Sequence, residues 1–164
     1  MQFKNISELQ NCIAAWKAEG ENIVFTNGVF DILHLGHVHY LQEARNLGSK
    51  LVVGINDDAS VKRLSKGPER PIHDQHARAG VIEALRSVDA VIIFSEDTPA
   101  SLIAVIQPDV LVKGGDYDAE ETDQTSKRYI VGSAETLHRG GKVVCIPLVA
   151  GYSTTGAVEK IKKQ

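Results

Sequence analysis

Two hydrophobic periodicities alternate along this chain of 164 residues. Runs of consecutive apolar residues are typical of strands buried on both faces of a parallel sheet, and they occur at residues 22–26, 51–55, 90–94, 109–113 and 142–146. Stretches with apolar residues every three or four positions predict helices at about 7–20, 37–47, 77–88, 99–106 and 153–162. Five strands alternating with helices predict an α/β fold with a five-stranded parallel sheet, Rossmann-like and doubly wound.

The predicted helix over residues 77–88 is amphipathic. Its apolar face consists of Ala77, Val81, Ala84, Leu85 and Val88, and we expect this face to pack on the sheet. The polar segment 117–139 has no clear period, and we expect it to be partly helical.

Composition narrows the class of protein. The length predicts a single domain over residues 1–164, and 43% hydrophobic with 24% charged residues is ordinary globular usage. A net charge of -3 argues against nucleic acid as a partner. Two cysteines far apart imply no disulfide framework, and no apolar run is long enough for a bilayer span or a signal peptide, so we expect a soluble cytoplasmic protein.

The segment between the first predicted strand and the next helix carries the strongest chemical signal. It reads Thr-Asn-Gly-Val-Phe-Asp-Ile-Leu-His-Leu-Gly-His over residues 26–37. His34 and His37 are three apart, so at a helix start both imidazoles face the same way. A helix N-terminus has unpaired N–H groups and a positive dipole end, which suit phosphate. The pattern indicates phosphoryl or nucleotidyl transfer, which needs positioning and charge neutralisation.

Two other segments follow strands or precede helices in the same way. Tyr152, Ser153, Thr154 and Thr155 come directly before the last predicted helix, where hydroxyl and N–H groups bind phosphate or simply cap the helix. The run Lys-Gly-Gly-Asp at residues 113–116 ends the fourth strand, and it is either a nucleotide-binding turn or an ordinary strand-to-loop turn.

A basic loop gives a third, weaker signal. Lys62, Arg63, Lys66 and Arg70 cluster on a Gly/Pro loop that either closes over a polyphosphate or is a solvated face, and Arg78 on the next helix is equally ambiguous. Zinc bound at His34, His37 and His39 is disfavoured, because the glutamate of zinc hydrolase motifs is missing. Walker A, GxGxxG and GxSxG motifs are also absent from the sequence.

Taken together, the His-Leu-Gly-His and Tyr-Ser-Thr-Thr motifs at residues 34–37 and 152–155 resemble those of the HxGH nucleotidyltransferase superfamily. A narrower resemblance, to D-glycero-β-D-manno-heptose 1-phosphate adenylyltransferases, extends over about residues 22–162. It rests on the segments at residues 56–64, 66–71, 94–99 and 108–117. The stretch over residues 118–141 is longer than we expect for this family and more acidic at its start, residues 118–123. Either this departure bears on the acceptor more than on the transfer chemistry, or the acidic cluster is a solvated face.

The resemblance implies a reaction. ATP and heptose 1-phosphate give ADP-heptose and pyrophosphate, with Mg²⁺, for lipopolysaccharide core biosynthesis. His37 and His34 are the implied catalytic residues, and no protein metal ligand is implied. Nucleotide-binding residues would also be Asn27, Gly28, Val29, Phe30, Lys113, Gly114, Asp116, Tyr152, Ser153, Thr154 and Thr155. Asp31, Lys62, Lys66 and Arg70 would face the second substrate or pyrophosphate. A separate heptose kinase and a homodimer are further expectations.

Two alternatives stay open at this point. The chain is also compatible with a cytidylyltransferase acting on glycerol 3-phosphate or another small alcohol phosphate, because backbone groups that read the base leave no side-chain signature. A nucleotide-binding module without catalysis is the alternative outside the enzyme class.

Overall fold

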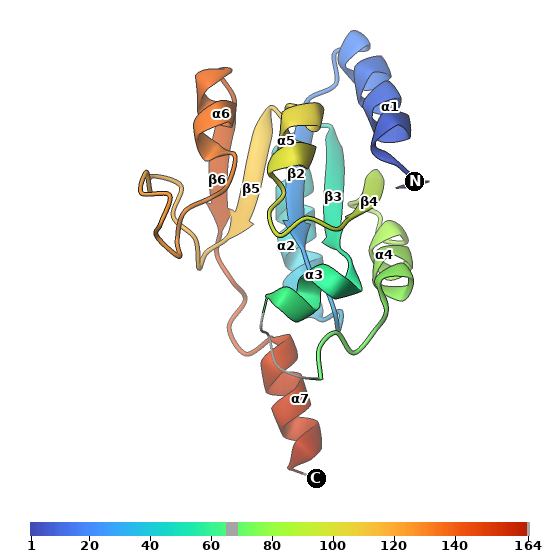
Figure 1. The fold of residues 1–164 in the computed structure, drawn as a ribbon, viewed down its shortest axis with the longest axis vertical. Coiled ribbons are helices and arrows are strands. Elements are labelled where there is room, and N and C mark those ends of the chain that lie inside the picture. The colour runs from blue at the N-terminus through green and yellow to red at the C-terminus, as the bar shows by residue number, and fades with distance from the viewer. Residues whose placement is uncertain (65–68, 164) are drawn as a thin grey trace.

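The computed structural model describes residues 1–64 and 69–163 and contains one parallel sheet with helices on both faces (Figure 1). The strand order is β1-β4-β3-β2-β5-β6, and every pair of neighbours is parallel. The strands are β1 (Gln2–Phe3), β2 (Ile23–Gly28), β3 (Lys50–Asn56), β4 (Ala90–Phe94), β5 (Val110–Gly114) and β6 (Lys142–Ile146). The α/β class and the parallel sheet therefore match the prediction.

The prediction of five strands is wrong by one. Gln2 and Phe3 form β1, which pairs with Val91 and Ile92 of β4 at the edge of the sheet. Two residues are too few to show an alternating or continuous apolar pattern, so their strand conformation depends on the partner strand and leaves no sequence signal.

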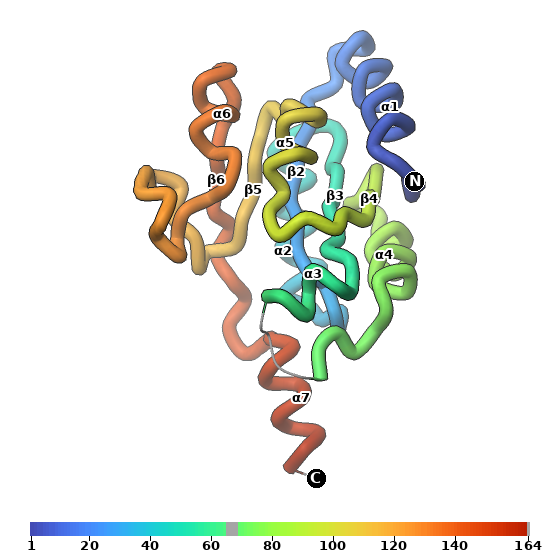
Figure 2. The backbone as a smooth tube through the Cα atoms, in the orientation of Figure 1, coloured from blue at the N-terminus to red at the C-terminus, as the bar shows by residue number. Residues whose placement is uncertain are grey.

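Helices α1 and α5 cover one face of the sheet, and helices α2 and α4 cover the other (Figures 1 and 2). The helices are α1 (Ile6–Ala18), α2 (Leu35–Arg45), α3 (Asp58–Arg63), α4 (Gln75–Glu83), α5 (Ala100–Ile106), α6 (Ser133–His138) and α7 (Thr154–Lys162). Central strands such as β3 are buried on both faces, which explains their continuous apolar runs. No helix in the described ranges combines the length and apolar content that a membrane crossing requires.

The predicted apolar face of the helix at residues 77–88 is wrong at three of its five positions, whereas Val88 is buried and Leu85 packs against the core as predicted. Ala77, Val81 and Ala84 are exposed, and α4 buries Arg78 together with Ala79 and Ile82. The helix ends at Glu83. The hydrophobic periodicity predicts Arg78 on the polar face because it counts only apolar side chains as buried. An arginine can be buried when acceptors surround its guanidinium group, and those acceptors come from distant segments.

The sheet has its topological switch point between β2 and β5. From β2 the chain passes to α2 on one face, whereas after β5 it passes to Ile130, which packs into the core of the opposite face. The two connections diverge and leave a crevice at the carboxyl ends of these strands, where ligands bind in folds of this kind. α7 projects from this end of the molecule and is drawn below α3 in Figure 1.

Candidate active site

The β2–α2 connection brings the two histidines together at the start of α2. The rings of His34 and His37 are stacked, with centroids 3.8 Å apart and an interplanar angle of 19°. His34 is the N-cap residue of α2, and its carbonyl oxygen accepts a hydrogen bond from the His37 amide at 2.9 Å. The prediction that both imidazoles point the same way is therefore confirmed.

Phe30 fixes the other side of His37. Its ring meets that imidazole edge-on at 5.3 Å, and its backbone has a φ of 49°, in the left-handed region that side chains rarely adopt. A Cβ atom at Gly28 would lie 2.9 Å from the Phe30 ring, so only glycine allows the ring this position. Backbone strain of this kind is commonly retained where a site needs it.

The start of α7 lies against this connection, although 122 residues separate the two along the chain. Thr154 Oγ1 donates to the Ile32 carbonyl oxygen at 3.5 Å, and Ser153 caps α7 by accepting from the Gly156 amide at 3.0 Å. A Cβ atom at Gly36 would lie 3.5 Å from Tyr152 Cβ, which shows how closely the two helix starts approach. Two helix N-termini, each a centre of partial positive charge, therefore border one space.

That space is a cavity of about 500 Å³, the first cavity. It contains most of the residues that the sequence assigns to the nucleotide, together with Arg70. The predicted residues that line it are Asn27, Gly28, Val29, Phe30, His34, His37, Arg70, Gly114, Tyr152, Ser153, Thr154 and Thr155. Tyr40 also lines it; the sequence analysis missed this residue, although its position three after His37 places it on the same side of α2.

Asp31 holds the loop that carries Arg70. Its side chain is fully buried and accepts hydrogen bonds from Arg70 Nε and from the amides of Ile72 and His73. Burial favours the neutral acid, but these amides and the Arg70 charge outweigh it and leave the pKa of Asp31 below its usual value. Asp31 is not among the residues that line the first cavity, and its contact with the Arg70 guanidinium positions Arg70 there.

A second cavity, of about 400 Å³, adjoins the first and shares Asn27, Gly28 and Val29 with it. Lys113 and Asp116, which the sequence assigns to the nucleotide, line this second cavity. Lys113 Nζ donates to Asn27 Oδ1, so the ends of β5 and β2 are joined where the two cavities meet. The other walls of the second cavity come from the segments at and after the ends of β3 and β4 and from the connection between β5 and α6.

One predicted substrate residue, Lys62, is placed away from both cavities. Lys62 is exposed on α3 and lines neither cavity, and Lys66 lies outside the described residues. Arg63, from the same basic loop, bonds the Asp97 carboxylate and the Ser95 carbonyl oxygen. The structure thus brings Arg70 alone of the basic loop's described residues into the first cavity.

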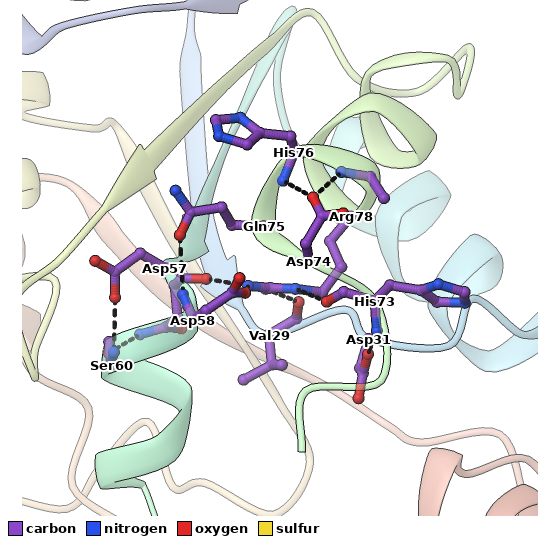
Figure 3. A network of polar contacts seen from close by, with 12 residues as sticks. Val29, Asp31, Asp57, Asp58, Ser60, His73, Asp74, Gln75, His76 and Arg78 are labelled. Atoms are coloured by element: carbon purple, nitrogen blue, oxygen red, sulfur yellow. Dashed lines mark hydrogen bonds and ion pairs between the residues drawn. The ribbon is translucent and has the colours of Figure 1, made fainter. Parts of the chain in front are cut away.

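Arg78 ties together the segments behind both cavities (Figure 3). Its guanidinium group donates to the carbonyl oxygens of Val29, Asn56 and His73 and to the Asp58 carboxylate, at distances of 2.7–3.0 Å. The residue is 1% exposed. Neither reading from sequence, a solvated charge or a phosphate ligand, describes this role, which is to fix the wall at Val29 that the cavities share.

A larger cavity, of about 730 Å³, lies at the opposite end of the sheet. Residues 46–49, 107–110 and 139–142 border it, and these follow the C-terminal ends of α2, α5 and α6. Helix C-termini carry partial negative charge, and Lys17, which lines this cavity, donates to the carbonyl oxygens of Ile106 and Gln107 at the end of α5. Arg139 and Lys142 also line the cavity, but none of the residues of the two motifs at 34–37 and 152–155 does. The chemistry therefore points to the two cavities at the carboxyl ends of the strands.

A family profile described as cytidylyltransferase-like matches residues 25–155. The chain belongs to the cytidylyltransferase-like family. The matched region extends from β2 to the first turn of α7, so it contains both stacked histidines and both helix N-termini. Membership of the nucleotidyltransferase superfamily, predicted from the two motifs, is confirmed.

Relatives of this cytidylyltransferase-like chain are longer proteins. It is 51% identical over 156 residues to the bifunctional protein HldE of Mesorhizobium japonicum and 48% identical over 163 residues to the protein of that name from Magnetococcus marinus. These alignments cover 95% and 99% of this chain but only 30% and 32% of the relatives. The chain thus spans about a third of the length of the curated relatives it matches.

Solved structures show the same fold. A lipopolysaccharide core biosynthesis protein from Thermoplasma volcanium is 31% identical, with a TM-score of 0.60, over 79% of this chain and 98% of that one. A pantoate–β-alanine ligase from Francisella tularensis, 12% identical with a TM-score of 0.59, covers 100% of this chain and 79% of that one and shares the fold.

Proposed function

We propose that the chain is an adenylyltransferase that moves AMP from ATP to D-glycero-β-D-manno-heptose 1-phosphate, giving ADP-heptose and pyrophosphate for lipopolysaccharide core biosynthesis. One observation carries the transfer chemistry: the stacked His34 and His37 at the start of α2 share a cavity with the start of α7. The choice of acceptor is supported by the similarity to HldE proteins and to a lipopolysaccharide core biosynthesis protein.

The first cavity holds the triphosphate in this proposal. Amide groups at the two helix N-termini and the Arg70 guanidinium bind its oxygens, and the positive field offsets their charge. His37 donates a hydrogen bond to an α-phosphate oxygen and stabilises the charge that builds there in the transition state. His34 binds the departing phosphates.

The acceptor enters from the second cavity and meets the α-phosphate at the shared residues. An oxygen of the sugar phosphate forms a bond to the α-phosphorus while the bond to the β-phosphate oxygen breaks, and pyrophosphate leaves with that electron pair. The nucleophile is already an anion at neutral pH, so the chain needs no strong base. Lys113, at the boundary beside Asn27, offsets repulsion between the two phosphates.

A divalent cation fits this site as a partner of the nucleotide. The described ranges contain no group of three or more His, Cys, Asp or Glu side chains that could hold a metal ion. Mg²⁺ usually binds through substrate phosphates and one or two carboxylates. Asp116 would supply the carboxylate: it lines the second cavity, and its Oδ1 would lie 2.8 Å from a Cβ atom at Gly114, which lines the first. When bound, the ion would neutralise phosphate charge.

Pyrophosphate release tests the proposal. The protein is incubated with ATP or CTP and with heptose 1-phosphate or glycerol 3-phosphate, and pyrophosphate is measured for each combination. We expect the largest kcat/KM for ATP with heptose 1-phosphate. Preferred turnover of CTP with glycerol 3-phosphate would establish the cytidylyltransferase alternative, and no turnover with any pair would refute the proposal.

Substrate supply and assembly extend the proposal. A sugar 1-phosphate has to be made by phosphorylation, so a kinase, separate or fused, acts before this reaction.

We also expect a homodimer, which light scattering coupled to size-exclusion chromatography measures directly.

His34 predicts a pH dependence of ATP binding. Burial lowers the pKa of His34 from its ordinary value of 6.5, so the imidazole is neutral at pH 7 without ligand. A phosphate group beside the His34 imidazole favours its charged form, so the protein takes up a proton when ATP binds. We therefore expect the affinity for ATP to rise as pH falls from 8 to 6, by at most about tenfold per pH unit. Without ligand the same shift lowers the free energy of unfolding as pH falls below 6.5.

Calorimetry in two buffers with different ionisation enthalpies measures the proton uptake. Because ATP titrates in the same range, the control is His34→Gln, which keeps the ATP contribution and removes the imidazole. Equal uptake by wild type and His34→Gln would contradict the assignment.

A further inference from the structure

The connection between β5 and α6 forms one wall of the second cavity. This segment, residues 115–132, contains the acidic stretch at residues 118–123. Lys127, Tyr129 and Val131 reach the second cavity from it, and Asp116 and Tyr117 do so at its start. The wall faces Asn27, Gly28 and Val29, where the acceptor meets the nucleotide in the proposed function.

Internal contacts hold this segment in a defined shape. Asp118 and Arg128 are joined twice, by a backbone hydrogen bond of 3.0 Å and an ion pair of 3.2 Å, which closes the intervening residues into a loop. Ile130, fully buried, anchors the loop in the hydrophobic core, and the Tyr117 ring lies beneath Lys113 Nζ at 5.3 Å from its centroid. The side chains that reach the cavity therefore come from an anchored wall.

Three carboxylates of the loop, those of Asp118, Glu121 and Asp123, are engaged in its own turns. Asp118 accepts from the Glu120 amide, Glu121 accepts from the Asp123 amide, and Asp123 accepts from the Thr125 amide and hydroxyl. Glu121 and Asp123 have pKa values below their ordinary values because of these hydrogen bonds. The acidic stretch therefore shapes the loop, and Asp118, Glu120, Glu121 and Asp123 are not among the residues that line the second cavity.

Lys127 and Tyr129 are the two side chains of the loop that we consider available to bind a ligand in the second cavity. Within the described ranges no ion pair involves Lys127, whereas its neighbour Arg128 is paired with Asp118. Asp97 and Asp116 also line this cavity, so it combines ammonium groups with carboxylates. That mixture suits a ligand with both a phosphate and several hydroxyl groups, since the hydroxyls donate to carboxylates and the phosphate accepts from ammonium groups.

We propose that Lys127 and Tyr129 are specificity-determining residues for the acceptor, with the lysine binding the anionic oxygens of a phosphorylated polyol and the tyrosine packing on its carbon skeleton. The proposal rests on the proposed transfer reaction but not on heptose as the acceptor. Any sugar or polyol phosphate that attacks from the second cavity meets these two side chains.

The test compares Lys127→Gln and Tyr129→Leu with wild type in pyrophosphate release, varying the acceptor and the nucleotide separately. We expect Lys127→Gln to raise the KM for the preferred acceptor by about tenfold or more, as for loss of a charged hydrogen bond, and to leave the KM for nucleotide within about twofold. Tyr129→Leu should narrow the difference in kcat/KM between heptose 1-phosphate and glycerol 3-phosphate, because only the larger acceptor loses contact area.

Lys142→Gln is the matched control, because Lys142 is an exposed lysine that lines the cavity at the other end of the sheet. An acceptor KM for Lys127→Gln equal to that of Lys142→Gln would overturn the proposal. If no acceptor supports turnover in wild type, the proposed transfer reaction is refuted. The role of Lys127 is then tested by titrating heptose 1-phosphate into the complex of the protein with α,β-methylene-ATP. A weaker affinity for heptose 1-phosphate in Lys127→Gln than in wild type supports the proposal, and an equal affinity overturns it.

Discussion

Replacing His37 with alanine should lower turnover by about 10²–10³-fold, as for loss of one transition-state hydrogen-bond donor, with a much smaller change in ATP affinity. The reason is geometric. The His37 ring is held between His34, stacked at 3.8 Å, and the edge of Phe30 at 5.3 Å, so no neighbouring imidazole can take its position without losing the stack. The measurement is kcat from pyrophosphate release beside the Kd for ATP from calorimetry.

His39→Ala is the control, because His39 lies on the same helix with its side chain exposed. It should retain wild-type kcat and ATP affinity. Equal losses of binding and turnover in His37→Ala would instead indicate a nucleotide-binding module without catalysis.

Replacing Arg78 with methionine should destabilise the chain by about 3 kcal/mol, the lower end for breaking a buried ion pair, because Asp58 is 33% exposed and water screens it in part. Three carbonyl oxygens, those of Val29, Asn56 and His73, lose their donor as well. Urea unfolding measures the loss, and kcat should fall too, because Val29 lines both cavities.

Arg45→Met is the control that separates the loss of stability in Arg78→Met from its loss of kcat. Arg45 also pairs with a carboxylate, that of Asp89, and donates to the Gly48 carbonyl oxygen, but at the amino end of the sheet. It should cost stability and leave kcat per folded molecule unchanged. If Arg78→Met keeps wild-type kcat at a temperature where it is fully folded, the wall at Val29 does not depend on Arg78.

The parts of the fold that could be predicted are those whose signal is local. The central strands are buried on both faces, so each shows as a run of apolar residues, and the two histidines are three apart on one helix. The start of α7 was also predicted, because hydroxyl residues before an amphipathic stretch favour an N-cap.

The parts that could not be predicted depend on partners far along the chain. The acceptors of Arg78 at Val29 and Asn56 are 49 and 22 residues away, and they are backbone oxygens, which every residue has. The second cavity is lined by segments that lie far apart in the sequence, so the sequence alone did not single out Lys127 and Tyr129. The strand conformation of β1 depends on its pairing with β4, and the buried face of α4 depends on the acceptors around Arg78, so neither could be predicted from the local sequence.

The contact between Thr154 and Ile32 joins the last helix to the first crossover, yet the sheet is already complete at Ile146. The start of α7, which is half of the proposed phosphate site, is thus appended to a core that closes without it. Proteolytic clipping after β6 would leave an intact, inactive scaffold, and substitutions along α7 can adjust substrate affinity during evolution with little penalty to folding.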